Sequence, residues 1–288
     1  METRLRIAVQ SKGRLYDETM ELLGEAGVKL TAVKRTLLVP SRNFPVELLF
    51  LRDDDIPHSV ASGIADIGIV GLNEVMEKDA DVEILKNLGF SRCRLSLAIP
   101  QRIEYNGLQW FNGRKIATSY PIILEKFLKE NNISADIHVI TGSVEIAPGI
   151  GLADAIFDIV SSGSTLVSNN LVEVEKVVES QAVLICSKKA QISAEKQAIL
   201  NELMFRFDAV KAADGKKYIL MNVPKDKLND VLAELPGIKS PTILPLANDQ
   251  WCSVHTVIEE KRFWEIIGRL RTAGAEGILA LDIEKMII

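Results

Sequence analysis

Short apolar segments alternate along this chain with helical patterns, and the loops between them are short. Segments at 5–9 and 67–70 each run into a Gly-containing turn and then into a helix-like stretch. This alternation predicts strands in a parallel or mixed sheet, covered by helices. With 288 residues, 47% of them hydrophobic, the chain can form two or three domains with their own cores. We therefore predict an α/β fold.

A four-residue pattern occurs twice, each time before a buried strand. Gly-Ile-Ala-Asp at 63–66 precedes the apolar segment 67–70, and Gly-Leu-Ala-Asp at 151–154 precedes the segment 155–160. In both places a helix end, a strand and a Gly-containing turn follow in the same order. The repeat predicts two similar lobes facing each other across a cleft, which is a preferred place for a ligand.

The last 70 residues have a different pattern. Strands are predicted at 218–223, 242–246, 251–258 and 277–283, and helices at 225–235 and 262–274. The order βαββαβ is that of a ferredoxin-like unit, which small-molecule regulatory domains often use. The segment contains no nucleophile beside a base, so we expect it to be regulatory or interfacial rather than catalytic.

Charge and composition exclude several classes of function. A net charge of −5 and a pI near 5.5 provide no basic field for nucleic acid or an anionic membrane. Three cysteines and three histidines are scattered without metal-ligand or triad spacing. No apolar run reaches 18 residues, and the first residues lack an export-signal pattern. We expect a cytoplasmic protein without a membrane segment.

A hydroxyl-rich turn is the strongest candidate site. The apolar segment 155–160 leads into Ser161, Ser162, Gly163, Ser164 and Thr165, and a helix pattern follows. Backbone N–H groups, hydroxyls and a helix N-terminus at one turn can bind a phosphate. The simpler alternative is an ordinary N-cap turn.

Two carboxylates accompany this turn. Asp154 and Asp158 are four residues apart, and on an extended strand this spacing places both on one face. Beside a phosphate site they would accept hydrogen bonds from sugar hydroxyls or share a bridging Mg²⁺. They could instead be solvated strand residues.

Other strand ends carry further candidates. Lys12 and Arg14 lie between the first strand and its helix, and Arg52 follows a second strand, so all three could bind phosphates. Gly71 and Glu74 follow a third strand, where a base or ribose could approach the backbone. Surface ion pairs, aspartates at 53–55 that cap a helix, and a simple turn are the alternatives.

Taken together, these segments resemble the long form of the ATP phosphoribosyltransferase family, over essentially the whole chain. The matching segments are 5–8 with 13–15, 52–57, 93–98, 116–121, 142–166, 240–246 and 283–286. The resemblance implies two lobes of the periplasmic-binding-protein type (type II) and a C-terminal regulatory domain. The implied boundaries are 1–93 with 185–217 for the first lobe, 94–184 for the second and 218–288 for the regulatory domain.

The resemblance also implies a reaction and roles. The family joins N1 of ATP to the ribose of 5-phosphoribosyl 1-pyrophosphate (PRPP) and releases pyrophosphate, as the first step of histidine biosynthesis, with Mg²⁺ and as a dimer or hexamer. Catalytic roles would fall to Asp154, Asp158, Arg14 and Arg52. PRPP would bind to Glu145, Ser161, Ser162, Gly163, Ser164 and Thr165, and ATP or pyrophosphate to Lys12, Gly71 and Glu74. Histidine, as inhibitor, would bind near Ser240, Thr242 and Asp249.

Two other classes of protein compete with this interpretation. A non-catalytic two-lobed protein that binds a small anion would explain the cleft and the Gly turns, but it needs no βαββαβ domain. A nucleic-acid-binding regulator conflicts with the acidic balance and with the absence of a basic, aromatic-rich patch.

Overall fold

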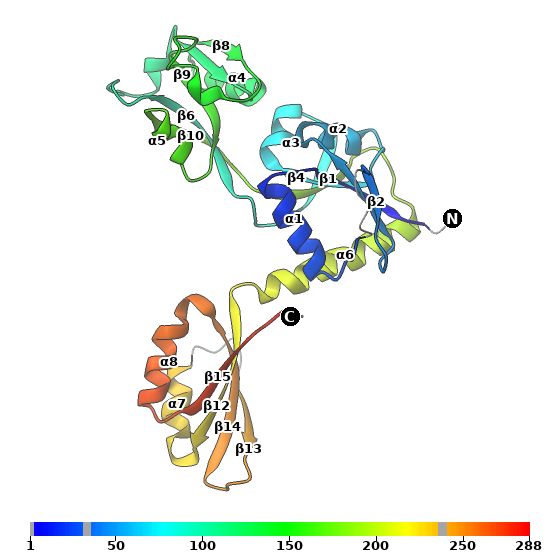
Figure 1. The fold of residues 1–288 in the computed structure, drawn as a ribbon, viewed down its shortest axis with the longest axis vertical. Helices are drawn as coiled ribbons and strands as arrows, with labels where there is room; N and C mark the ends of the chain where they lie inside the picture. The colour runs from blue at the N-terminus through cyan, green and yellow to red at the C-terminus, as the bar shows by residue number, and fades with distance from the viewer. Residues whose placement is uncertain (1–2, 31–35, 236–240) are drawn as a thin grey trace. The chain divides into compact units, whose positions relative to one another are not determined.

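A computed structural model describes residues 3–30, 36–235 and 241–288 (Figure 1). The chain forms two compact units, residues 1–24 with 28–200 and residues 25–27 with 201–288. The first unit contains two separate sheets with their helices, and the second contains one sheet.

The first sheet has six strands in the order β2-β3-β1-β4-β11-β5. Its strands are β1 (Leu5–Gln10), β2 (Leu38–Pro40), β3 (Val46–Leu51), β4 (Ile67–Gly71), β5 (Val82–Asn87) and β11 (Ala182–Ser187). The helices nearby in sequence are α1 (Arg14–Glu25), α2 (Ile56–Ala61), α3 (Leu72–Lys78) and α6 (Ala194–Ala213). Strand β1 is parallel to β3 and β4 and fully apolar on its buried face, as expected for a central strand covered on both sides.

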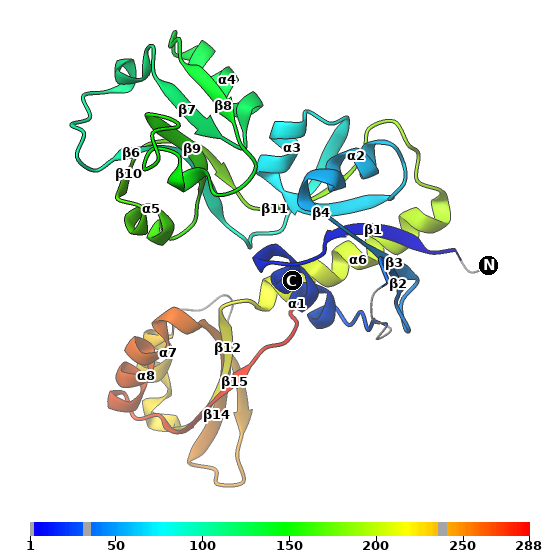
Figure 2. The same cartoon turned by 45° about the horizontal axis from the view of Figure 1, so that its top comes forward.

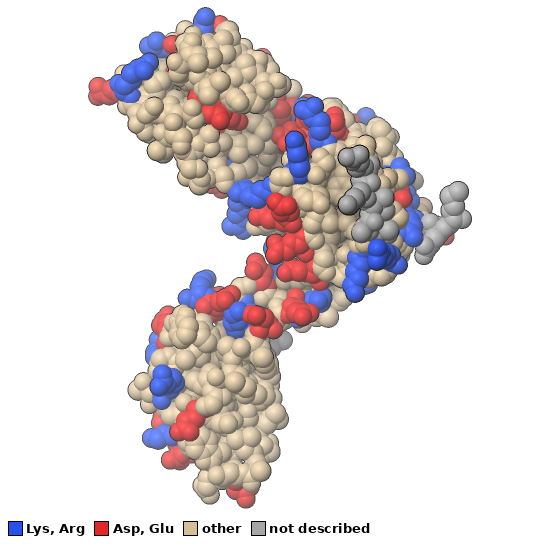
Figure 3. All heavy atoms as spheres, in the orientation of Figure 1, with Lys and Arg blue, Asp and Glu red and all other residues tan. Residues whose placement is uncertain are grey.

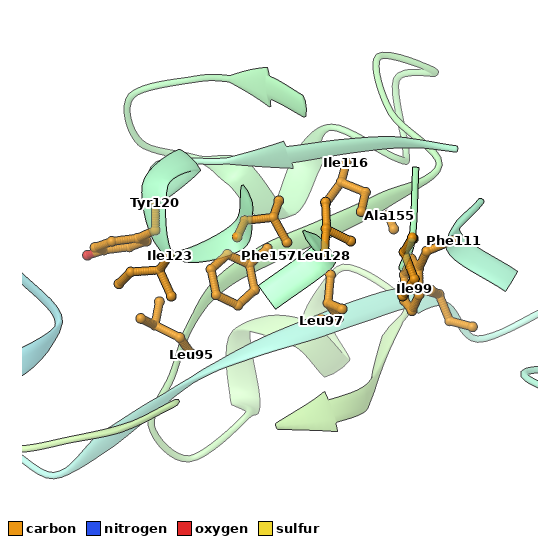
Figure 4. Packing of buried hydrophobic residues seen from close by; sticks show 12 residues of the cluster. Leu95, Leu97, Ile99, Phe111, Ile116, Tyr120, Ile123, Leu128, Ala155 and Phe157 are labelled. Atoms are coloured by element: carbon orange, nitrogen blue, oxygen red, sulfur yellow. The ribbon is translucent and has the colours of Figure 1, made fainter. Parts of the chain in front are cut away.

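The second sheet has five strands in the order β10-β6-β9-β7-β8. These are β6 (Cys93–Pro100), β7 (Lys115–Thr118), β8 (Asp136–Val139), β9 (Ala155–Val160) and β10 (Leu171–Ser180), with helices α4 (Pro121–Glu130) and α5 (Ser164–Ser168). Figure 4 shows the core between this sheet and α4, where Phe157 and Leu97 lie among the other apolar side chains. In the described residues of both units, short 3-10 turns are η1 (Asp53–Asp55), η2 (Leu108–Phe111), η3 (Val144–Ile146), η4 (Lys225–Lys227) and η5 (Glu260–Arg262).

The two sheets have equivalent strand orders, which confirms the predicted pair of similar lobes. In each, two parallel strands (β1 and β4, or β7 and β9) are followed by an antiparallel strand that the chain adds when it crosses between lobes (β11 or β6). The predicted boundary at residue 184 was wrong by a few residues. Because β11 pairs with β4 and β5, the second lobe ends at Ser180.

The repeated Gly-x-Ala-Asp pattern has the same structural role in both lobes. The Asp66 carboxylate accepts the N–H of Arg6 at 2.7 Å, while the Asp66 N–H donates to the Arg6 carbonyl at 3.0 Å. In the same way, the Asp154 carboxylate accepts the N–H of Lys115 at 2.9 Å, and the Asp154 N–H donates to the Lys115 carbonyl at 2.8 Å. Each aspartate therefore fixes the start of a central strand against its parallel neighbour. The repeat therefore predicted the internal symmetry correctly. Its structural role in each lobe is to align a central strand with its parallel neighbour.

The second unit contains the expected βαββαβ domain. Its elements are β12 (Lys216–Pro224), α7 (Leu228–Glu234), β13 (Thr242–Pro245), β14 (Trp251–Glu259), α8 (Phe263–Thr272) and β15 (Glu276–Asp282). All neighbouring strands are antiparallel in the order β13-β14-β12-β15, and both helices lie on one face of the sheet (Figure 2). The core beneath them includes Ile219, Val254, Ile266 and Leu270.

The aspartates at 53–55 do not cap a helix. They form η1, and Asp55, which directly precedes α2, has helical dihedral angles and makes no side-chain capping bond. The cluster of acids still lies directly before the first residue of α2, where negative charge is favourable.

Candidate functional site

The hydroxyl-rich turn of residues 161–165, called the phosphate loop below, lies at the carboxyl end of β9. Gly163 has φ +84°, which places it in the left-handed region that glycine adopts without strain. Within the described residues, the backbone N–H groups of Ser162, Gly163 and Thr165 have no hydrogen-bond acceptor. Three free N–H groups with neighbouring hydroxyls are the kind of donors that can bind an anion. The following helix, α5, has only five residues, so its dipole adds less than the sequence suggested.

A pocket of about 240 Å³ adjoins this loop. Its lining brings together several of the residues predicted to bind PRPP: Glu145, Asp158, Ser161, Ser162, Gly163 and Thr165. Glu145 lies in η3, at the end of the segment that follows β8, so the site combines two loops of one lobe. The structure therefore supports the predicted grouping of hydroxyls and carboxylates.

Asp158 is one of two carboxylates that line this pocket, the other being Glu145. The pKa of Asp158 is raised to about 6, mainly by burial, with the Ile159 N–H hydrogen bond acting to lower it and the negative charge of Glu145 acting to raise it. A carboxylate in this state gains most from a ligand that donates hydrogen bonds or carries positive charge. Asp158 can therefore orient sugar hydroxyls or contribute to binding a cation.

The structure does not bring Asp154 to this site, which corrects the prediction that both aspartates share the ribose. Asp154 precedes β9 and its carboxylate holds the Lys115 N–H, at the opposite end of the strand from the phosphate loop. The spacing argument assumed that the strand extends through Asp154, whereas it begins at Ala155.

Arg14 connects the other lobe to the phosphate loop. Its Nη1 donates to the Ser161 hydroxyl at 2.7 Å, and its Nη2 donates to the Arg92 carbonyl at 2.9 Å. Arg52 and Lys12 are not brought there. Arg52 is 79% exposed and pairs with Asp54, and Lys12 is exposed at the end of β1. Of the three predicted cations, only Arg14 touches the loop.

Glu74 belongs to a buried cluster, and Gly71, which is partly exposed, directly precedes the helix that carries Glu74. A Cβ on Gly71 would lie 2.4 Å from Asn73 Oδ1, which explains the glycine. Glu74 is 6% exposed, and its carboxylate accepts from Asn73 Nδ2 at 2.9 Å and from the Tyr120 hydroxyl at 3.1 Å. Burial, with a contribution from the negative charge of Asp53, raises the pKa of Glu74 to about 7. The predicted contact of Glu74 with ATP is not supported by this burial.

The same cluster joins α3 of the first lobe to α4 of the second. Glu77 accepts the N–H groups of Ile122 and Ile123, both at 3.0 Å, and so caps α4. Figure 4 shows Tyr120 at the end of the apolar core, with its hydroxyl pointing away from the other labelled side chains. Sequence reasoning missed this cluster. The signal was available at Tyr120, because a helix that starts with Pro121 after a tyrosine lacks a capping side chain of its own.

A second pocket, of about 510 Å³, was also missed. It is lined by Arg92, Cys93, Arg94, Ser161, Lys176, Glu179, Ser180 and Gln181. Arg94 donates to the Ser161 carbonyl at 3.0 Å and pairs with Glu173. Arg92 and Arg94 lie on either side of Cys93, the first residue of β6. In the sequence, this segment cannot be distinguished from ordinary charged surface.

The residues expected near a histidine site lie on the edge hairpin of the C-terminal sheet. Thr242 begins β13 opposite His255, and Asp249 lies in the turn before β14; both are exposed. Ser240 lies outside the described residues.

The described residues contain no group of three or more His, Cys, Asp or Glu side chains that could hold a metal ion. None of the helices within the described ranges is long and apolar enough to cross a membrane. On the face drawn in Figure 3, Lys and Arg are interspersed with Asp and Glu and form no continuous basic surface.

The fold defines the class first: a two-lobed α/β protein with two equivalent mixed sheets and a C-terminal βαββαβ domain. The family model described as ATP phosphoribosyltransferase matches residues 52–209, and that described as HisG, C-terminal domain, matches residues 213–285. The chain belongs to the ATP phosphoribosyltransferase family, which makes it a pentosyltransferase.

Close relatives cover the whole chain. The ATP phosphoribosyltransferases of Bacteroides thetaiotaomicron and Bacteroides fragilis are 69% and 70% identical over 284 residues, 99% of this chain and 100% of each relative. That of Cytophaga hutchinsonii is 55% identical over 287 residues, with 100% of both chains covered. The solved structure described as the ATP phosphoribosyl transferase (HisG:HisZ) complex from Thermotoga maritima has a TM-score of 0.60 at 25% identity, covering 70% of this chain and 98% of that chain.

Proposed function

We propose that this chain transfers the phosphoribosyl group of PRPP to N1 of ATP and releases pyrophosphate. The observation that carries this proposal is the phosphate loop, where three free N–H groups lie beside the Asp158 carboxylate in one pocket. The names of the relatives supply the two substrates, and the pocket supplies groups suited to one of them.

The 5′-phosphate of PRPP fits the phosphate loop. The N–H groups of Ser162, Gly163 and Thr165 would donate to its oxygens, with the Ser162 and Ser164 hydroxyls as further donors. Charge-assisted hydrogen bonds of this kind are short and strong, and they fix the position of the sugar.

The ribose would lie between the loop and the two carboxylates. Its hydroxyls would donate to Asp158 and Glu145, which both line the pocket. In the transfer, the bond from C1 of the ribose to the pyrophosphate oxygen breaks and its electron pair leaves with pyrophosphate. The lone pair of adenine N1 forms the new bond to C1. Positive charge develops on the ribose, and the ionised Asp158 would stabilise it.

No covalent nucleophile is needed for this step, so the protein contributes position and charge. Arg14, which comes from the other lobe and already contacts Ser161, would neutralise charge on the departing pyrophosphate. Because Arg14 reaches the loop from the first lobe, we expect its contact to depend on the relative position of the two lobes.

Mg²⁺ is expected with PRPP. Asp158 and Glu145 provide two carboxylates in one pocket, and no third ligand joins them among the described residues. This set fits an ion that uses one or two carboxylates and substrate phosphates for the rest of its shell. When bound, the ion would neutralise pyrophosphate charge.

We further propose that free histidine binds the C-terminal domain and inhibits the enzyme, which assembles as a dimer or hexamer. Support comes from the complete βαββαβ domain and from the exposed hairpin that carries Thr242 and Asp249. Asp249 could bind the ammonium group of the ligand. Calorimetry on the intact protein should show histidine binding that Asp249→Asn weakens; no heat at millimolar histidine would contradict the proposal.

Pyrophosphate release tests the main proposal. The protein mixed with PRPP, ATP and Mg²⁺ should release pyrophosphate only when both substrates are present, and histidine should slow the release without competing with either substrate. A two-lobed binding protein without catalytic function would release none.

A further inference from the structure

We propose that Arg94 is a positioning residue that orients the phosphate loop toward the 5′-phosphate, an inference that rests on the proposed function. Arg94 is the second residue of β6 and lies opposite Val160, the last residue of β9. Its side chain can therefore reach the first peptide of the loop from the neighbouring strand.

All three nitrogens of the Arg94 guanidinium are occupied by the protein. Nη1 donates to the Ser161 carbonyl at 3.0 Å, while Nε and Nη2 donate to the two carboxylate oxygens of Glu173. Glu173 also accepts from the Ser96 hydroxyl at 2.7 Å. These contacts use three of the five N–H donors of the guanidinium and fix its plane. One of them holds the backbone of the loop.

Because the peptide bond is planar, fixing the Ser161 carbonyl also fixes the direction of the following N–H. In a trans peptide the carbonyl and the following N–H point in opposite directions. Because Arg94 fixes the Ser161 carbonyl on its side of the loop, the Ser162 N–H points away from Arg94. The Ser162 N–H itself has no acceptor in the described part of the chain.

Ser161 is held from two sides, by groups with different functions. Arg14 contacts its hydroxyl from the other lobe, whereas Arg94 contacts its carbonyl from within the same lobe. The Arg94 contact does not depend on the position of the other lobe. The loop can therefore be ordered before any lobe movement, which lowers the entropy lost on binding PRPP.

The planar fork makes arginine specific for this position. Lys cannot donate to the Glu173 carboxylate through two nitrogens and to the Ser161 carbonyl through a third with the same geometry. Arg94→Lys should therefore be partly impaired, and Arg94→Met more so. Glu173→Gln should have a smaller effect in the same direction, because it leaves the arginine in place but less firmly held.

The test compares KM values with direct binding. Arg94→Met should raise KM for PRPP by roughly 10- to 100-fold, as expected for a lost charge-assisted hydrogen bond, while KM for ATP stays within about twofold. Arg114→Met is the matched control, since Arg114 stacks on Trp110 and precedes β7, away from the loop. The Arg94→Met effect should be non-additive with Glu173→Gln, because both act through one carbonyl.

Three outcomes are distinguishable. An unchanged KM for PRPP, or equal rises for both substrates, overturns the role of Arg94. If Arg94→Met does not fold, Arg94→Lys and Glu173→Gln decide by the same criterion. If the wild type releases no pyrophosphate, the proposed transfer fails. Calorimetric binding of ribose 5-phosphate then tests Arg94 alone: weakened binding in Arg94→Lys supports its role, and wild-type affinity overturns it.

Discussion

Replacing Glu74 with Gln should make the first unit more stable at high pH and leave it unchanged at low pH. Glu74 is buried between α3 and α4, and its ordinary pKa of 4.5 is raised to about 7, mainly by burial. The folded protein therefore binds a proton more tightly than the unfolded chain does. Between pH 4.5 and 7 the folded state retains this proton while the unfolded state loses it, so the free energy of unfolding falls as pH rises.

The two pKa values set the size of this effect. A difference of about 2.5 between them corresponds to about 3 kcal/mol. Gln is close in shape to the protonated acid and can keep the hydrogen bonds with Asn73 and Tyr120. The wild type should thus lose up to about 3 kcal/mol between pH 5 and pH 8 that Glu74→Gln retains.

Urea unfolding at several pH values measures this difference. Replacing Trp251 and Trp264 with Phe leaves Trp110 as the reporter, and Trp110 packs in the core of the second lobe. Glu125→Gln, on an exposed position of α4, controls for the loss of any acid. Identical pH dependence in the wild type and Glu74→Gln would refute the reasoning.

Three further predictions concern the phosphate loop and its strand. Gly163→Val, which forces a β-branched residue into φ +84°, should raise KM for PRPP by at least about tenfold in steady-state kinetics, and an equal rise for ATP would argue against the loop as the phosphate site. In the wild type, kcat/KM for PRPP should fall as pH drops below about 6, where Asp158 is protonated. In Asp158→Asn, kcat/KM should be low at every pH and should not show this fall at acidic pH. Asp154→Asn should lower the free energy of unfolding by about 1–3 kcal/mol and leave KM for PRPP unchanged, which thermal unfolding and kinetics check together.

The architecture could be predicted from local pattern because strands and helices alternate with clear apolar periods. The repeated Gly-x-Ala-Asp pattern showed two related lobes, and the C-terminal element order was correct throughout. The pattern could not show where the chain returns to the first sheet. Segment 171–187 contains two strands with only Gln181 between them, and their hydrogen-bond partners are what separate β10 from β11.

The candidate site was predictable where one short segment carries all the groups, as in the phosphate loop. It was not predictable where a function depends on pairs that are distant in sequence. Arg94 gains its role from Ser161, which lies 67 residues away. From the sequence, Glu74 was predicted to lie in an accessible turn. In the structure it is a buried acid, because Tyr120 from the other lobe packs against it. Asp154 was misassigned because spacing gives a face only if the strand includes both residues.

The new carbon–nitrogen bond tests the central claim most directly. ATP labelled with ¹⁵N at N1 and PRPP labelled with ¹³C at C1 are mixed with the protein and Mg²⁺, and the product is examined by NMR. The proposed transfer predicts a one-bond coupling between the two labels, formed together with pyrophosphate. Unchanged ATP, with or without hydrolysis of PRPP to ribose 5-phosphate, would contradict it.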